Sequence, residues 1–144
     1  MGNISQLFSA MRSSSSGLSA ERTRIDVISR NIANAQTTSM PDGTGPYRRQ
    51  VVHFAPILER TALGQLTASG VRVERVANDL ATPFEIVHDP SHPDSDRDGN
   101  VHMPNVNTMK EMADLITAMR SYESNLKAQE GFFEMARQAL RLAQ

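Results

Sequence analysis

The sequence contains no cysteine, and this absence excludes several kinds of site. Disulfides, thiol catalysis and cysteine-ligated metal centres all require a thiol or thiolate. The sequence also has no apolar run that approaches the roughly 20 residues needed for a helix to cross a bilayer. We therefore expect neither a disulfide-stabilised fold nor a membrane-spanning protein.

The chain also has no large excess of basic over acidic residues, or of acidic over basic ones. The formal net charge of −1 provides no overall attraction to nucleic acid or to an anionic membrane. Polar residues, including Ser13 to Ser16 and Gly17, occupy the region where a secretory signal would be apolar, so we expect no cleaved signal peptide. The pair Arg48 and Arg49 could contact nucleic acid, but basic residues on an exposed edge strand are the simpler interpretation.

Motifs of catalysis are absent as well. The sequence has no Gly-rich phosphate loop between a strand and a helix, no Gly-x-Ser-x-Gly and no His-Glu-x-x-His. Carboxylates lie scattered in helical patterns or gathered in one acidic loop. We therefore predict that the protein is not an enzyme, holds no cofactor and has no small-molecule substrate.

Apolar residues recur every seven positions near the carboxyl terminus. One row is Met112, Met119, Leu126, Phe133 and Leu140, and a second follows three residues later at Leu115, Tyr122, Gln129, Ala136 and Ala143. Two rows with this period are typical of a long helix that packs on another helix, here most simply the other end of the chain. Thr108 and Glu111 predict a capping box at the start of this helix.

The amino-terminal arm has the same period. Its apolar row is Ile4, Met11, Leu18, Ile25 and Ile32, and its second row, Leu7, Ser14, Glu21, Ile28 and Ala35, is interrupted by polar residues. The run from Ser13 to Gly17 costs a helix about 3 kcal/mol relative to alanine. The run is therefore either a flexible hinge, or part of a helix that forms only when a partner covers its apolar row.

The middle of the chain changes pattern. A cluster of Pro and Gly between Met40 and Pro46 ends the first helix, and short β-rich runs follow at Tyr47–Phe54, Val71–Val76 and Phe84–His88. The segment from Ile57 to Leu66 is ambiguous between loop and strand.

These patterns together predict an α+β fold, in which two long terminal helices form a coiled-coil-like pair with a small β-rich insert between them. We expect an amino-terminal core helix in residues 1–38, a β-rich middle domain in residues 39–104 and a carboxyl-terminal core helix in residues 105–144.

The acidic loop at residues 88–102 resembles the start of a calcium loop. Asp94, Asp96, Asp98 and Gly99 have the required spacing, but the twelfth position is Asn105 instead of glutamate. His88 and His92 with Asp94 could ligate zinc, but no third well-spaced ligand follows. Turn-forming chemistry accounts for this composition. A coiled-coil adaptor or calcium-binding module, and an enzyme with a metal centre, are the alternatives that this loop leaves open.

A family resemblance is carried by both arms. Residues 16–37, with Asn31-Ile-Ala-Asn34 and Thr37 at their core, resemble the amino-terminal signature of bacterial flagellar axial proteins, the rod and hook group. Pro104-Asn-Val-Asn107, Glu111-Met112 and the segment 120–125 resemble the matching carboxyl-terminal signature. The short length and the middle runs at 47–54 and 89–94 resemble the proximal members of the basal-body rod family, over nearly the whole chain.

The resemblance implies a structural function. Proteins of this family are exported through the flagellar type III system without signal cleavage and polymerise into the rod that crosses the periplasm and transmits torque. Their terminal helices form the tubular core and the middle domain faces outward. The implied partners are copies of the chain, other rod proteins, and the MS ring and the export-gate or hook-basal-body adaptor at the base.

We predict an assembly interface that combines the apolar rows with the signature amides. Its residues are Ile25, Ile28, Asn31, Ile32, Asn34, Leu115, Met119, Tyr122, Asn125 and Leu126. The apolar side chains are expected to hold one subunit's helices to each other and to its neighbours. The three asparagine amides are expected to join backbone groups between subunits, because a buried amide must be paired.

Overall fold

The computed structural model describes the backbone of residues 2–60 and 64–142 and the side chains of residues 9–60 and 64–141. Two long antiparallel helices, α1 (Gly2–Ala33) and α2 (Thr108–Leu142), flank the β-rich insert in the sequence. The insert contains the hairpin of β1 (Gln50–Arg60) and β2 (Leu66–Asn78), and the short hairpin of β3 (Glu85–His88) and β4 (Asn100–Met103). The predicted α+β fold, two long terminal helices with a small β-rich insert between them, is thus confirmed, and the coiled-coil-like pairing of the helices stays a prediction.

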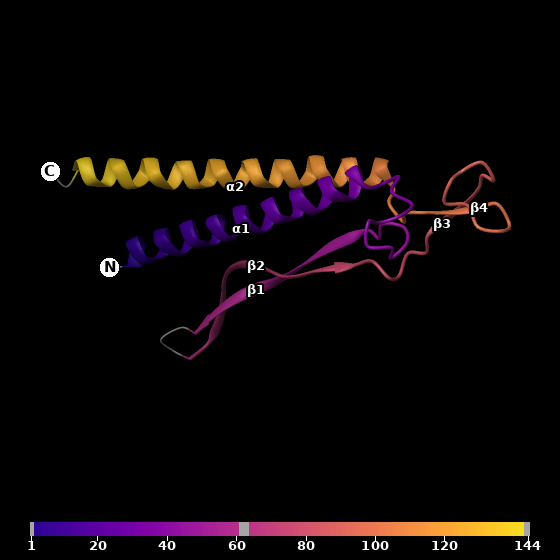
Figure 1. Ribbon diagram of the computed structural model, residues 1–144. Coiled ribbons are helices and arrows are strands. Elements are labelled where there is room, and N and C mark those ends of the chain that lie inside the picture. Colours follow the sequence, from indigo (N-terminus) through magenta and orange to yellow (C-terminus); the bar gives the residue numbers. More distant parts are fainter. Residues whose placement is uncertain (1, 61–63, 143–144) are drawn as a thin grey trace.

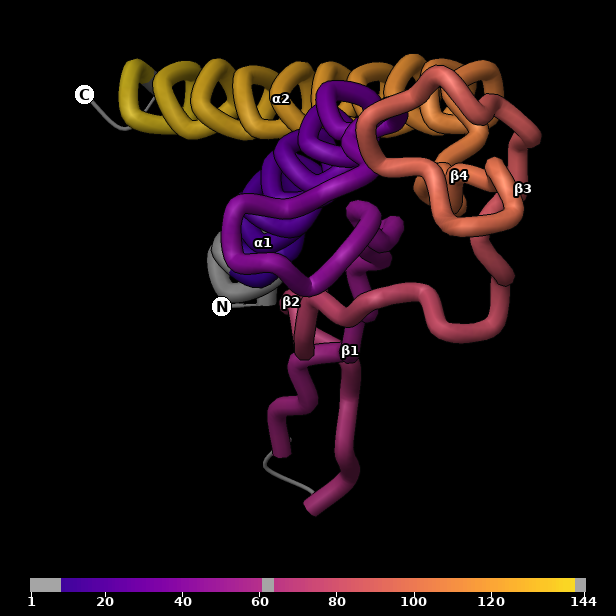
Figure 2. Tube along the Cα trace, turned by 45° about the vertical axis from the view of Figure 1, so that its right-hand side comes forward, coloured from indigo at the N-terminus to yellow at the C-terminus, as the bar shows by residue number. Residues whose placement is uncertain are grey.

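Helix α1 is the central layer of the molecule. In both ribbon and tube views it lies between α2 and the β1–β2 hairpin (Figures 1 and 2). The β3–β4 hairpin projects beyond the end where α1 finishes and α2 begins (Figure 1). Within the described residues, neither helix is long and apolar enough to cross a membrane.

The inward face of α2 contains one of the two predicted rows, and its other row begins one position earlier than predicted. Its least exposed positions alternate in steps of four and three residues: Glu111, Leu115, Ala118, Tyr122, Asn125, Gln129, Phe132 and Ala136. The predicted row that begins at Leu115 belongs to this face. The predicted row that begins at Met112 is exposed along its length, so the prediction that it packs on α1 is wrong. The period of seven residues is correct, but the second inner row is the one that begins at Glu111.

Close approach of the helices explains this difference. Gly17 of α1 lies against Asn125 of α2, and a Cβ on residue 17 would be 3.1 Å from Nδ2 of Asn125. Ala20 and Ala118 are buried nearby. The separation of two packed helices depends on the side chains at the contact, so small residues here permit a short separation. A large apolar row between the helices would force them apart.

The serine run is helical and is covered by β2. Ser16 Oγ donates to the Ser13 carbonyl at 2.7 Å and accepts the Val71 N–H at 3.1 Å. Gly70 packs directly on Ser16. Of the two interpretations of this run, the helix with a covering partner agrees with the structure, and the partner is strand β2.

The β1–β2 hairpin is antiparallel, from the pair Gln50–Asn78 to the pair Arg60–Leu66. Its register shifts between His53 and Phe54 and again between Ile57 and Leu58. The ambiguous segment that begins at Ile57 contributes strand residues up to Arg60 and again from Leu66, while residues 61–63 lie outside the described part. Strand β4 was not predicted, because its residues begin inside the acidic loop at 88–102.

Substituting Gly70 tests how the hairpin is attached to α1. We expect Gly70→Ala to lower the free energy of unfolding by about 1–3 kcal/mol, because the added methyl overlaps Ser16 Oγ. Ser16→Ala alone should cost about 1 kcal/mol through the lost hydrogen bond to Val71. The double variant should cost less than the sum, since the overlapping oxygen is gone. Urea unfolding of the four proteins measures this, and strict additivity would contradict the contact.

Candidate functional site

Asn31 is the centre of a buried polar network at the end of α1. Its Nδ2 donates to the Gln50 carbonyl at 2.9 Å and to Glu111 Oε2 at 3.0 Å. Its Oδ1 accepts the Gln50 N–H and the Tyr47 hydroxyl, both at 2.9 Å. An asparagine amide has two donors and two acceptor sites, so these four bonds use its full capacity. The side chain is 1% exposed and joins α1 to β1 and α2 within one chain.

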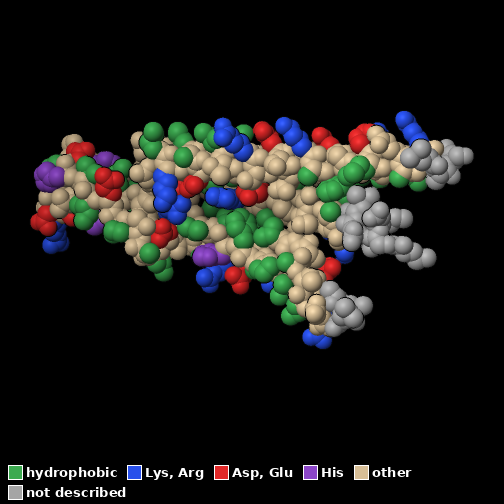
Figure 3. All heavy atoms as spheres, turned by 180° about the vertical axis from the view of Figure 1, so that it is seen from behind, with side chains coloured by type: hydrophobic (Ala, Val, Ile, Leu, Met, Phe, Trp, Pro, Cys, Tyr) green, Lys and Arg blue, Asp and Glu red, His purple; other side chains and the backbone are tan. Residues whose placement is uncertain are grey.

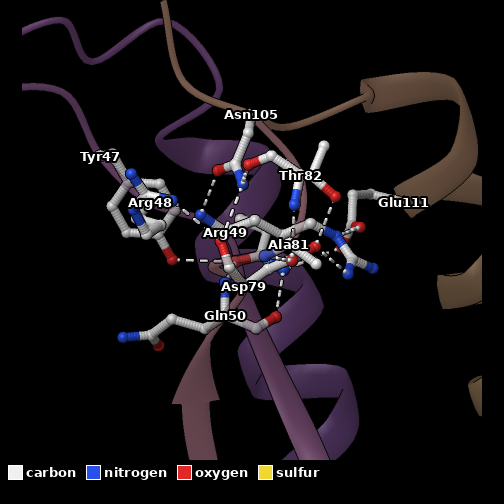
Figure 4. A network of polar contacts seen from close by, with 10 residues as sticks. Tyr47, Arg48, Arg49, Gln50, Asp79, Ala81, Thr82, Asn105 and Glu111 are labelled. Atoms are coloured by element: carbon white, nitrogen blue, oxygen red, sulfur yellow. Dashed lines mark hydrogen bonds and ion pairs between the residues drawn. The ribbon is translucent and has the colours of Figure 1, made fainter. Parts of the chain in front are cut away.

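Arg49 and Glu111 form the charged half of this network. Arg49 Nε donates to Glu111 Oε1 at 2.7 Å, and Arg49 Nη1 lies 3.6 Å from Asp79 Oδ2 (Figure 4). Glu111 is 1% exposed, so its carboxylate cannot be solvated by water. The hydrogen bonds from Arg49 and Asn31 replace those that water would make. The pair fixes the first turn of α2 to the start of β1.

Asn105 extends the network to the segment before α2. Its Oδ1 accepts the Arg49 N–H at 2.8 Å, and its Nδ2 donates to the carbonyls of Asp79 and Thr82 at 3.1 and 2.9 Å (Figure 4). We call these residues, Asn31, Tyr47, Arg49, Gln50, Asp79, Asn105 and Glu111, the polar junction. The polar junction joins the end of α1, the start of β1, the end of β2 and the start of α2.

The junction explains two further sequence features. Burial raises the pKa of the Tyr47 phenol, which therefore stays protonated and donates to Asn31. Helix α2 is capped by Asn107, whose Oδ1 accepts the Lys110 N–H at 3.0 Å, and not by Thr108. The predicted capping box is wrong, because the Glu111 side chain is directed to Arg49 and Asn31.

The basic pair in the middle domain is also engaged inside the chain. The Arg48 guanidinium lies 4.1 Å from the centre of the Phe84 ring, and its Nη1 donates to the Asp79 carbonyl at 3.2 Å. Arg49 is held by Glu111 and Asp79. The interpretation of both arginines as solvated residues of an edge strand is therefore wrong. Their proximity to Tyr47 in the sequence was a signal of the junction, but the acidic partners come from distant segments.

Asp79 gives the junction a predictable response to acid. Hydrogen bonds from Thr82, first from its backbone N–H and then from its hydroxyl, hold the pKa of Asp79 below its usual value. A lowered folded-state pKa contributes stability above the unfolded-state value of about 3.9, and this contribution is lost as the pH falls through the folded-state pKa.

We therefore expect Asp79→Asn to lower the melting temperature at neutral pH and to have a much smaller effect near about pH 3, where the wild-type carboxylate also loses its charge. Melting curves at both pH values measure the difference. The matched control is Asp98→Asn in the exposed part of the acidic loop. An equal cost of Asp79→Asn at both pH values would contradict a role for the ionised carboxylate.

The predicted interface residues fall into three groups. Ile28 and Asn31 are buried inside the chain. Half-buried positions are Ile25, Ile32, Asn34, Leu115, Tyr122 and Asn125. Met119 and Leu126 are exposed. The structure thus brings part of the predicted set together within one subunit and leaves the other part on the surface.

The signature amides all have partners inside the chain. Besides Asn31, the Asn34 Nδ2 donates to the Arg30 carbonyl at 2.9 Å and the Asn125 Nδ2 donates to the Ser121 carbonyl at 3.1 Å. Thr37 Oγ1 donates to Asn34 Oδ1 at 3.3 Å. The amide of Asn31 has no capacity left for a neighbouring subunit, whereas Asn34 and Asn125 are half-buried and have only local bonds.

Exposed apolar side chains recur along α2, from its outer face near the start of the helix to the flank beside its inner face further on. The members of this set, Met109, Met112, Ile116, Met119, Leu126, Phe133 and Leu140, have exposed fractions from 40% for Leu126 to 79% for Met109. In the space-filling view, hydrophobic side chains reach the surface over the first part of α2, and charged side chains take over along its outer edge further on (Figure 3). We call this set the apolar stripe. A stripe of this length on a protein surface is typical of an interaction site.

The acidic loop uses its carboxylates for turns. Asp96 Oδ1 accepts the N–H groups of Asp98 and Asn100 at 2.9 and 2.8 Å. Asp94 Oδ2 accepts the hydroxyl of Thr38 at 2.6 Å, which ties the loop to the end of α1. Among the described side chains of residues 9–60 and 64–141, no three metal-ligating groups lie together in a way that could hold an ion.

Comparison with known proteins matches both arms and most of the chain. Residues 11–39 match the family described as flagella basal body rod protein, and residues 97–142 match the family described as flagellar basal body rod FlgEFG protein C-terminal. The flagellar basal-body rod protein FlgC of Borreliella burgdorferi is 43% identical, covering 96% of this chain and 98% of the relative. The FlgC proteins of Bacillus subtilis and Aquifex aeolicus are 38% and 35% identical, over 94% and 85% of this chain and 97% and 86% of theirs. The predicted resemblance to the C type of proximal rod protein is confirmed.

Proposed function

The chain belongs to the family of flagellar basal-body rod proteins, and from this membership we propose how it assembles in the rod. It is a structural subunit of the proximal rod and not an enzyme. We propose that it polymerises through the outward faces of its terminal helices, so that residues 1–38 and 105–144 form the core of the shaft and residues 39–104 face outward.

The apolar stripe is the single observation that carries this proposal. Seven large apolar side chains on one helix remain exposed in the single chain. Burying each one in a contact would contribute on the order of 1 kcal/mol, since about half of its surface is still in water. The inner face of α2 already has a partner in α1, so we propose that the apolar stripe is covered by another subunit.

The polar junction supports the mechanical part of the proposal. A shaft that transmits torque needs subunits whose core and outer parts turn together. The junction joins both helices to both long strands through hydrogen bonds and one buried ion pair. The side chains of Asn31, Asn105 and Glu111 are paired within the junction, and buried polar groups that are paired in this way favour a single, rigid arrangement.

The predicted interface divides accordingly. We propose that Met119 and Leu126 contact neighbouring subunits, while Ile28 and Asn31 hold the subunit itself together. The other predicted residues are half-buried, and we propose that they become more buried on assembly. They are Ile25, Ile32, Asn34, Leu115, Tyr122 and Asn125.

We also propose the route and the neighbours that the family resemblance implied. The chain is exported by the flagellar type III system without cleavage of a signal peptide and is assembled in the periplasm. Its neighbours are copies of itself and other rod proteins, with the MS ring and the export-gate or hook-basal-body adaptor at the base. Amino-terminal sequencing of the chain from isolated basal bodies tests the route, and a shortened amino terminus would contradict it.

Protection of Met119 on assembly is the direct test of the helix-based interface. The chain has no cysteine, so Met119→Cys provides a unique thiol. We expect this thiol to react with a maleimide in the purified monomer, where residue 119 is half exposed, and about tenfold more slowly in isolated basal bodies. Leu80→Cys, in the outward-facing middle domain, is the control and should react in both. Equal reactivity of residue 119 in monomer and basal body would contradict the proposal.

A further inference from the structure

We propose that the apolar stripe of one copy packs into a groove between α1 and the β1–β2 hairpin of the next copy. The inference rests on the proposed function and specifies which two surfaces meet when subunits polymerise. The two surfaces are different parts of the same chain, so the contact is head-to-tail. A head-to-tail contact repeats without using up either surface and generates a ring or a helical filament.

The groove is a cavity of about 390 Å³ where α1, α2 and the hairpin meet. Its floor consists of small residues of α1, Ser13, Gly17 and Ala20, and its hairpin wall includes Phe54 and Gly70. Phe54 is 39% exposed beside this space. A groove with a floor of small residues and an aromatic wall has room for large apolar side chains from outside.

The stripe has side chains of the complementary kind. Met109, Met112 and Met119 are long, unbranched and exposed in the first half of α2. Methionine adapts its three side-chain torsions to irregular contacts, and large side chains fill the holes between small ones when helices pack. The stripe therefore provides the volume that the groove lacks.

Charge supports the same pairing. The Glu21 side chain lines the groove and is only 18% exposed, its Oε2 has no hydrogen bond among the described residues, and its nearest cation, Arg24 Nη1, is 4.0 Å away. On the stripe, Arg120 follows Met119 directly, is exposed and has no ion pair within the described part of the chain. A cation brought beside a partly covered carboxylate stabilises its charged form. Packing the stripe into the groove brings Arg120 of one copy toward Glu21 of the next.

A contact of the stripe with itself fits these observations less well. Two stripes related by a two-fold axis would leave Glu21 in the groove without a cation from the partner. Such a pair would also close as a dimer and would leave both grooves empty. We therefore commit to the groove of a second copy as the partner of the stripe.

Disulfide crosslinking in assembled rods tests this pairing. The chain has no cysteine, so Ser13→Cys and Met119→Cys place one thiol in the groove and one on the stripe. Within one chain these residues lie on different helices, and the contact of Gly17 with Asn125 sets residues 13 and 119 well apart along the antiparallel pair, so a bond inside the subunit is not expected. In basal bodies treated with copper-phenanthroline, the double variant should form a ladder of dimers, trimers and longer products. Neither single variant should crosslink to itself.

Three outcomes would overturn the inference. These are dimers formed by Met119→Cys alone, products that contain a different rod protein only, and assembled basal bodies of the double variant that remain uncrosslinked. The last outcome leaves the proposed function intact, because Met119 can still be protected from maleimide by another surface. Loss of that protection would instead contradict the proposed function itself.

A charge exchange supplies a second readout. Glu21→Arg and Arg120→Glu should each reduce the crosslinking yield of the cysteine pair by about threefold, as expected for one lost ion pair. Combining both exchanges restores opposite charges across the contact and should restore the yield. If the combined variant loses as much crosslinking yield as the two single exchanges together, Glu21 and Arg120 are not in contact.

Discussion

A strain carrying Leu126→Asp should be non-motile, although the altered chain is made, folded and exported. In the single chain Leu126 is 40% exposed, so a carboxylate there can still reach water and the fold is retained. In the rod the same position would face a neighbouring subunit. An unpaired charge buried in an apolar contact costs several kcal/mol, and the cost recurs at every subunit.

The measurements separate assembly from folding. Swimming assays, electron microscopy of basal bodies and the amount of exported chain should show lost motility, absent rods and unchanged export. Ala128→Asp adds the same charge to α2 on the side away from Leu126, where residue 128 is also exposed, and it should be tolerated better. Motile cells with intact rods in the Leu126→Asp strain would sink the proposal that the apolar stripe is an assembly surface.

Asn31→Ala should produce the largest loss of stability of any single substitution in the junction. It removes four hydrogen bonds and leaves the Tyr47 hydroxyl, both backbone groups of Gln50 and one oxygen of Glu111 without this partner. Each bond contributes about 1 kcal/mol and the bond to the charged carboxylate more, so we expect a loss of about 3–5 kcal/mol. Urea or thermal unfolding of the purified chain, followed by circular dichroism, measures it.

Asn34→Ala is the matched control for this prediction. It is the same substitution three residues later, at a half-buried amide that bonds only to Arg30 and Thr37. Its cost should stay near about 1 kcal/mol. If Asn31→Ala and Asn34→Ala destabilise the chain equally, the junction does not hold the subunit together as its geometry implies.

The sequence predicted the helices well because their signal is periodic. A seven-residue repeat identifies a helix and its period without any knowledge of the partner. The sequence did not indicate which face of α2 is turned toward α1. The prediction used rows of large apolar residues, while one inner row contains Glu111, Ala118 and Asn125. The short separation of the helices requires a small residue such as Ala118 in this row, and Glu111 is needed there because it pairs with Arg49 and Asn31 in the polar junction. The apolar row that the sequence made most visible is the exposed one.

The polar junction was only partly predictable. Asn31 was identified through the family signature and Glu111 through the pattern at the start of α2. Their partners Tyr47 and Arg49 lie 16 and 18 residues from Asn31 along the sequence, and Asn105, which bonds to the Arg49 N–H, lies 74 residues away. No local pattern indicates which distant groups will meet. Strand β4 was missed for a related reason, because pairing with β3 stabilises it and its own residues are mixed in character.

The junction also fixes the two helices at one end only. From there α1 and α2 separate toward Gly2 and Leu142 (Figure 1). The free ends of α1 and α2 can move slightly closer together or further apart without changing the contacts of the polar junction. The separation of the helices beyond the polar junction is therefore set by the contact of Gly17 with Asn125, and not by the junction itself.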